Sequence, residues 1–240
     1  MGGPGRRSPL LGDWARVLKE AIGDLLPSAF AVALSPIPII AVVLVLGAPK
    51  ARTAGPAFAF GWIAGLLAVS VIVVLALEPG SDPDSDDPGV NWLKVAIGVL
   101  FLLMAAKQWT KRPKDGQESD MPRWMATIDT ATPPRAAALG AALSGANPKN
   151  LALTLAAAAS IAEAGLDQAE RAIAIAVFIA LGSVTVAGSV LFYLVDADRA
   201  ARPLAAIKRF MSDNNAVIMM VVLLLLGAKL LGDGLADLWS

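Results

Sequence analysis

The sequence contains neither cysteine nor histidine. The absence of cysteine excludes disulfide bonds, thiolate catalysis and zinc sites built on thiolates. The absence of histidine removes the commonest side-chain metal ligand and the usual base of a nucleophilic triad. The chain also has no phosphate-cradling P-loop, so we do not expect it to hydrolyse ATP. These absences predict a protein that is not an enzyme and that holds no metal or cofactor.

Charge of one sign is not in excess, since 20 lysines and arginines balance 20 aspartates and glutamates. A balanced chain has no general attraction for nucleic acid, and we expect no nucleic-acid partner. Hydrophobic residues, in contrast, make up 56% of the chain and are clustered in long runs. This pattern predicts an integral membrane protein. The runs contain no aspartate or glutamate, which argues against a proton relay built on carboxylates.

Six apolar runs have about the length that a helical membrane span needs. They lie at residues 27–46, 57–77, 90–106, 136–161, 172–195 and 216–231. A polar segment separates the first three runs from the last three. The organisation that we predict is a tail with an amphipathic segment at 1–26, a first three-helix repeat at 27–107, a cytoplasmic linker at 108–134 and a second three-helix repeat at 135–240.

The first and the fourth runs are each interrupted by proline and polar residues. The first reads ALSPIPII from Ala33, and the fourth reads ALSGANPKN from Ala142. Proline removes a backbone donor and breaks the helical ladder. In a bilayer, such a break is tolerated only where it is buried in protein or lines a cavity. Two broken segments at matching places in two halves point to the binding site of a transporter.

Further matches between the halves support an internal duplication. Gly61 in the second run corresponds to Gly182 in the fifth, and Lys107 at the end of the third corresponds to Lys229 near the end of the sixth. An odd number of spans in each repeat places the second copy upside down. The predicted fold is therefore all-α, with six transmembrane helices in two inverted three-helix repeats whose first helices are broken.

Lysine and arginine gather after the first, third and fifth runs, whereas the segment 78–88 after the second run is acidic. By the positive-inside rule, the basic loops face the cytoplasm. We therefore predict a multi-pass protein of the plasma (inner) membrane with both termini outside the cytoplasm. The acidic segment is interpreted as a solvated connector, and cation binding by it is left open.

The two interruptions supply the candidate substrate-binding residues. Lys149 stands at the start of the half-helix after the second break, where an anionic headgroup would meet an ammonium and a helix N-terminus. The amides of the same break can hydrogen-bond hydroxyl groups. The predicted set is Ser35, Pro36, Pro38, Ser144, Gly145, Asn147, Pro148, Lys149 and Asn150. The structural alternative is that Pro148 only kinks a helix and Lys149 extends to the interface.

Two further lysines are candidate gates. In an inverted pair, Lys107 and Lys229 would lie on opposite faces of the membrane. Each could close one side of a transport path. The alternative interpretation is that both are anchors in the membrane interface.

These motifs resemble the lysine-exporter (LysE) superfamily. The proline-broken first run, the basic turn at 49–52 and the end of the third run at 104–107 carry the resemblance. The pairing of Ser-Pro-Ile-Pro at 35–38 with Gly-Ala-Asn-Pro-Lys-Asn at 145–150 is more similar to the actinobacterial GAP family of sulfolipid- and glycopeptidolipid-addressing proteins. The resemblance implies export of a glycolipid to the cell envelope. The first break lacks the amide that is usual in the amino-acid exporters of the superfamily.

The predicted function is that of a secondary transporter that exports envelope glycolipid or a similar anionic amphiphile, with its site between the two broken helices. Two alternatives stay open: an exporter of small polar solutes such as amino acids or cations, and a non-transporting scaffold for lipid-synthesis or export machinery. The expected partners are membrane lipids, glycolipid or small-solute cargo, lipid-synthesis or export proteins, and a second copy of the chain in a homodimer.

Overall fold

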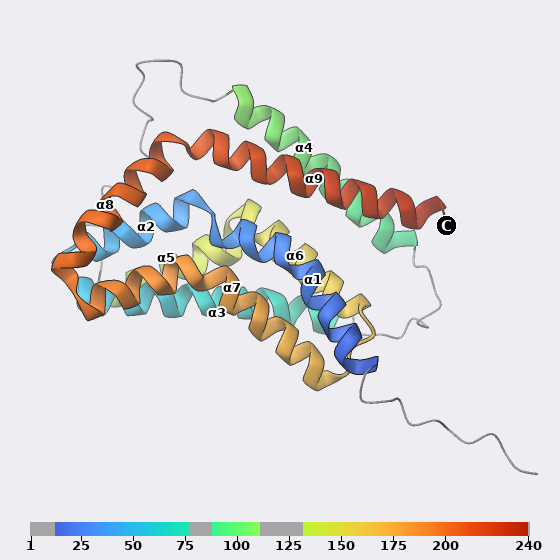
Figure 1. Cartoon of the computed structure of the whole chain (residues 1–240), viewed down its shortest axis with the longest axis horizontal. Coiled ribbons are helices and arrows are strands. Elements are labelled where there is room, and N and C mark those ends of the chain that lie inside the picture. Colours follow the sequence, from blue (N-terminus) through green and yellow to red (C-terminus); the bar gives the residue numbers. More distant parts are fainter. Residues whose placement is uncertain (1–12, 77–87, 111–131, 240) are drawn as a thin grey trace, which may run out of the picture.

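The computed structural model describes residues 13–76, 88–110 and 132–239, and these residues are almost entirely helical (Figure 1). The helices are α1 (Asp13–Ala33), α2 (Pro36–Gly47), α3 (Ala51–Ala76), α4 (Pro88–Thr110), α5 (Pro133–Ala141), the π-helical turn η2 (Ala142–Ala146), α6 (Pro148–Glu163), α7 (Gln168–Val195), α8 (Ala197–Asp213) and α9 (Asn215–Trp239). The start of the predicted tail, nearly all of the acidic segment 78–88 and most of the predicted linker lie outside the described residues.

Three of the described helices are long and apolar enough to cross a membrane, namely α3, α7 and the Asn215–Ala236 part of α9. A fourth candidate is the pair formed by α1 and α2, which meet at an angle of 50°. Helix α4 contributes a shorter apolar stretch, Val95–Thr110. The chain is therefore an all-helical membrane protein with three or four candidate spans in its described part. The predicted number of six stays a prediction.

Both predicted interruptions are present. Helix α1 ends at Ala33 and α2 begins at Pro36, while the fourth run is divided into α5, η2 and α6. At its other end, α1 continues without interruption through Pro27, so the amphipathic segment and the first span share one helix. The predicted boundary between residues 26 and 27 is thus not a boundary of secondary structure.

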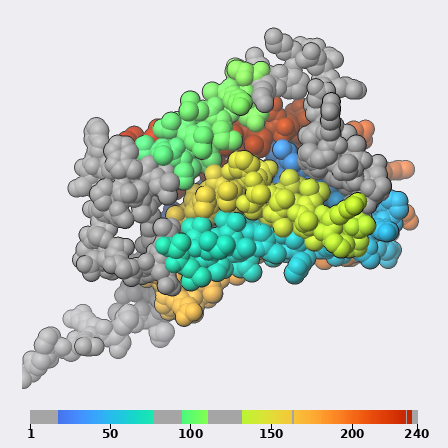
Figure 2. Space-filling model, turned by 180° about the vertical axis from the view of Figure 1, so that it is seen from behind, coloured from blue at the N-terminus to red at the C-terminus, as the bar shows by residue number. Residues whose placement is uncertain are grey.

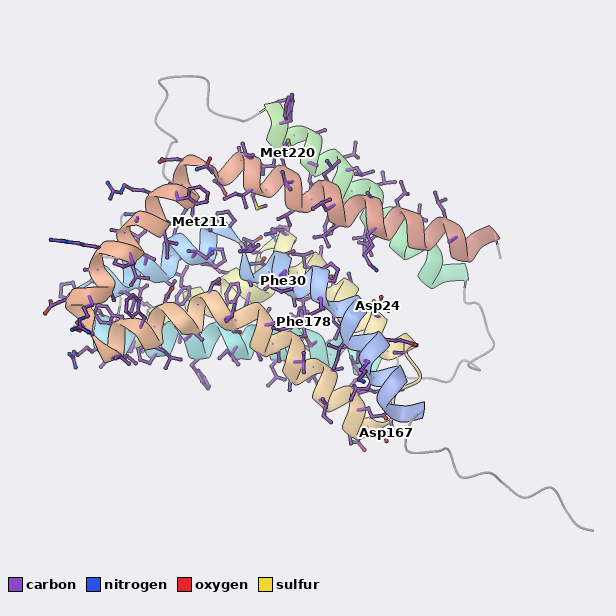
Figure 3. The ribbon with its side chains drawn as sticks, viewed as in Figure 1. Asp24, Phe30, Asp167, Phe178, Met211 and Met220 are labelled. Carbon is purple, nitrogen blue, oxygen red and sulfur yellow. The ribbon has the colours of Figure 1, made fainter. Side chains whose placement is uncertain are left out.

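The helices pair across the two halves of the chain. Helix α1 packs along α7, where Figure 3 shows Phe178 of α7 beside α1. Helix α3 packs along α5, and Figure 2 shows these two side by side on one face of the molecule. Helix α4 packs mainly on α9. The broken segment α1–α2 thus packs mainly on α7, and the broken segment α5–η2–α6 packs mainly on α3.

Glycine permits the close approach of α3 and α5. A Cβ atom built on Gly61 would overlap the backbone carbonyl of Ala137. Four residues further along α3, a Cβ atom on Gly65 would overlap the side chain of Ser144. From the first contact to the second, the residue numbers increase along both segments, from Gly61 to Gly65 and from Ala137 to Ser144. Helices α3 and α5 therefore run in the same direction. The close contact brings α3 directly against the start of the second break.

We expect Gly61→Ala to lower the free energy of unfolding by roughly 1–3 kcal/mol, because the added methyl forces two backbones apart. The measurement is the midpoint of thermal unfolding of the purified protein in detergent. Gly188→Ala is the matched control, since it also lies within a membrane-spanning helix but has nothing within 4 Å of the built Cβ atom. Alanine there should leave the midpoint unchanged or raise it slightly. Equal effects of the two substitutions would contradict the packing that we describe.

Candidate functional site

The first break leaves helical carbonyls without their usual donors. In a continuous helix the N–H of Ser35 would donate to Ala31 O, but here it donates to Val32 O at 3.1 Å. The N–H of Ile37 would reach Ala33 O, but Ile37 belongs to α2, beyond the 50° bend. Prolines 36 and 38 have no N–H to offer. The end of α1 therefore presents two backbone acceptors, Ala31 O and Ala33 O.

Side chains from the second half of the protein donate to these two carbonyls. Lys149 Nζ donates to Ala31 O at 3.0 Å, and Thr185 Oγ1 of α7 donates to Ala33 O at 2.6 Å. These donors are 118 and 152 residues away from their acceptors in the sequence. Buried backbone groups without partners are costly, above all in a membrane. The first break is therefore stabilised by the second half of the chain.

The second break begins as a π-helical turn. Asn147 N donates to Ala142 O at 3.0 Å, five residues back, so the carbonyl of Leu143 loses its usual donor. Asn150 Nδ2 takes that place and donates to Leu143 O at 2.8 Å. Asn147 Oδ1 accepts from the backbone N of Lys149 at 3.1 Å and so caps α6. Both asparagines thus hold the shape of the break.

Lys149 is the central residue of the site, because it comes from one break and reaches the other. Its side chain is buried, with 3% of its surface exposed. Among the described residues its ammonium has one partner, the Ala31 carbonyl, and forms no ion pair. An ammonium carries three N–H donors, so two remain available. The C-terminal end of α1 carries a partial negative charge that favours this cation.

Two buried polar atoms on α6 and α7, the helices that donate to the end of α1, have no hydrogen-bond partner among the described residues. Asn150 is fully buried, yet its Oδ1 atom accepts no hydrogen bond from any residue that the structure describes. The same holds for the hydroxyl of Ser183, which follows the glycine of α7 that lies against Val32 of α1. Buried polar atoms without a protein partner are the places where water or a ligand binds. The region therefore offers both donors and acceptors to a polar guest.

The remaining predicted residues shape the breaks. Ser35, Pro36 and Pro38 are buried at the first bend. Ser144 donates to Ala141 O at 3.1 Å and packs beneath Gly65. The other predicted residues of the second break are less buried. Gly145 and Asn147 are half-buried, and Pro148 is exposed.

The structure brings Lys149 of the second break to the end of α1 at the first break, and its side chain is buried there. Substrate binding by these residues stays a prediction. Lys107 and Lys229 are exposed on α4 and α9, and their role as gates stays a prediction. The sequence did not single out the carbonyls of Ala31 and Ala33. Thr185 lies in the fifth run, and no sequence pattern links it to the first break.

Comparison with known proteins adds one finding. Residues 25–236 match the protein-family model described as Sap, sulfolipid-1-addressing protein (SfLAP). Both breaks lie inside the matched range. Neither a curated protein nor a solved structure matches the chain significantly. The match confirms the sulfolipid-addressing part of the predicted resemblance, while the relation to the wider lysine-exporter superfamily stays a prediction.

Proposed function

Because this chain belongs to the family of the sulfolipid-1-addressing protein, we propose that it exports an envelope glycolipid or a similar anionic amphiphile. We propose further that it acts as a secondary transporter of the LysE type in the plasma membrane, without a resident cofactor and without enzymatic activity. The family match supports a glycolipid as the class of cargo. The geometry of the two breaks supports the location of the site.

The helix pairing supports the proposed inverted repeat. Helix α1 of the first half packs on α7 of the second, and α5 of the second half packs on α3 of the first. These two contacts correspond to each other if the halves are related by a two-fold axis in the membrane plane. The α4–α9 contact would then lie on that axis. We propose that the two halves move against each other across this contact, with their breaks facing each other.

The observation that carries the proposed site is the contact between Lys149 Nζ and Ala31 O. A carbonyl is a neutral partner, and a sulfate, phosphate or carboxylate headgroup would bind the same ammonium more strongly. Asn150 Oδ1 and the Ser183 hydroxyl could meet hydroxyl groups of a sugar. We propose that cargo replaces the Ala31 carbonyl as the partner of Lys149, which releases α6 from the end of α1. Rocking of one half against the other would follow.

The orientation and the partners belong to the same proposal. Both described ends of the chain, the start of α1 and the end of α9, lie at one end of the molecule (Figure 1). We propose that this end faces away from the cytoplasm. Membrane lipids surround the helices, and a lipid synthase, an export partner or a second copy of the chain would act with them.

Proteoliposomes test the proposal directly. The purified full chain is reconstituted into vesicles that contain a fluorescent sulfated glycolipid, and dithionite quenching reports the lipid in the outer leaflet. With an ion gradient imposed, we expect the outer-leaflet fraction to change faster than in protein-free vesicles. A fluorescent phosphatidylcholine serves as the cargo control and should not move faster. If no lipid moves, but a deletion strain still loses envelope glycolipid, the protein is a scaffold rather than a transporter.

A further inference from the structure

Helix α8 was not expected as a separate element, because its residues were interpreted as a basic loop. It begins after Asp196, whose side chain accepts from the backbone N of Arg199 at 3.0 Å. The helix connects α7 to α9 and crosses the molecule's end at a steep angle to both (Figure 1). It packs on α2 and α7. A helix that lies across the ends of membrane spans lies near the plane of the membrane interface.

Three faces of α8 have different character. Ala200 and Leu204 are buried against the bundle. At 100° per residue, Ile207 is about 20° from Ala200 and borders the buried face, while Phe210 is about 60° further round; together they form an apolar flank, with 41% and 58% of their surfaces exposed. Arg202, together with Arg209 seven residues later, lies opposite the buried face, and both arginines are exposed. Nitrogen-tipped side chains extend outward from α8 in Figure 3.

The exposed apolar flank has a counterpart at the end of α7, the candidate span that leads into α8. Phe192 and Val195 are exposed there, at 41% and 85% of their surfaces. Large apolar side chains at the end of a membrane span are covered by lipid. An apolar flank beside a basic face is the pattern of helices that bind at membrane surfaces.

Other basic residues gather at the same end of the molecule. Lys50 and Arg52 lie at the connection from α2 to α3, and both are exposed. Because α5 runs parallel to α3, Arg135 in its first turn lies at this end too. The opposite end carries the acidic cap of α7, in which Asp167 and Glu170 bond each other's backbone N–H. The end that holds α8 is therefore the basic end of the described structure.

One charge on α8 is already engaged. Arg199 Nε lies 3.1 Å from Asp196 Oδ2. Arg202 and Arg209 form no ion pair with a described residue. Two guanidinium groups thus lie on one outward face, and arginine binds phosphate groups through paired N–H donors.

We propose that α8 lies in the membrane interface and binds anionic phospholipid headgroups through Arg202 and Arg209, while Ile207 and Phe210 enter the acyl-chain region. The ligand is bulk lipid of the leaflet and not the cargo, so the inference is independent of the proposed function. Since α8 packs on α2, the half-helix after the first break, bound lipid would also hold α2 in place.

The test uses the purified full chain in detergent, with dioleoylphosphatidylglycerol or dioleoylphosphatidylcholine added. We expect phosphatidylglycerol to raise the midpoint of thermal unfolding more than phosphatidylcholine does, because a ligand of the folded state stabilises it. The double variant R202Q/R209Q should lose most of this difference, and R202K/R209K, which keeps the charge but not the paired donors, should retain part of it. Native mass spectrometry should show fewer phosphatidylglycerol molecules on the glutamine variant.

Two results would overturn the proposal. The first is an equal rise of the wild-type unfolding midpoint with both lipids, which would show that α8 contacts lipid only through its apolar side chains. The second is an undiminished phosphatidylglycerol response in R202Q/R209Q, which would remove the arginines as ligands. Without added lipid, the glutamine variant should unfold at the wild-type midpoint, since both side chains point away from the bundle.

Discussion

Lys149→Met is expected to reduce glycolipid export by about tenfold or more while the protein remains folded. The substitution removes the only described charge that joins the two breaks. A hydrogen bond from an ammonium to an anionic headgroup contributes about 1.5–3 kcal/mol, which corresponds to roughly a 10- to 100-fold change in binding. Initial rates of sulfated-glycolipid movement in proteoliposomes measure the effect.

The folding effect of the same change should be small, because two contributions oppose each other. Ala31 O loses its donor, which costs about 1–3 kcal/mol when the group is buried. Removal of a buried cation also ends its desolvation penalty, which is of similar or larger size. Methionine fills nearly the same volume. The unfolding midpoint should therefore stay close to that of the wild-type protein although transport is lost.

Lys19→Met is the matched control, since this lysine is exposed on α1. Its transport rate should equal that of the wild-type protein. Lys149→Arg retains the charge in a larger side chain, and it should keep part of the activity. Unchanged export by Lys149→Met would show that the ammonium only closes the end of α1 and binds no cargo.

Asn150→Leu is expected to lower the free energy of unfolding by about 1–3 kcal/mol, because Leu143 O then has no donor inside the protein. Asn150 is fully buried and water does not replace its amide. The change also removes the unpartnered Oδ1 atom, so export should fall as well. Thermal unfolding in detergent and the proteoliposome rate measure the two effects.

Asn214→Leu provides the comparison. Asn214 Nδ2 donates to Phe210 O at 2.9 Å, and this hydrogen bond is exposed. Both asparagines therefore supply an amide to a helix carbonyl, but water can take the place of only one of them. The unfolding midpoint of Asn214→Leu should change little. If Asn214→Leu lowers the unfolding midpoint as much as Asn150→Leu does, the hydrogen bond in the second break contributes no more to stability than an exposed one.

The breaks could be predicted from sequence because their causes are local. Proline removes a donor wherever it stands in a helix, so Pro36 and Pro148 mark the places where the ladder fails. The repeated Ala-Leu-Ser before each break located both interruptions to within a few residues. The all-helical membrane class followed in the same way from the apolar runs.

The donors that close the first break could not be predicted, because they come from far along the chain. No pattern near Ala31 indicates that Lys149 bonds its carbonyl, or that Thr185 reaches Ala33. Helix α8 was missed for a different reason. Its basic residues were counted as loop charges, although the spacing of Ala200, Leu204 and Met211 is that of one helix face.

The unequal roles of the two breaks mean that the two halves of the chain are not interchangeable. The first break presents two hydrogen-bond acceptors, the carbonyls of Ala31 and Ala33. The second break presents the Lys149 ammonium, which donates to Ala31 O. A protein assembled from two first halves would place bare carbonyls opposite each other. One assembled from two second halves would oppose two buried cations. If the halves arose by duplication, as we propose, each has since come to depend on the other, and neither could be replaced by a second copy of its counterpart.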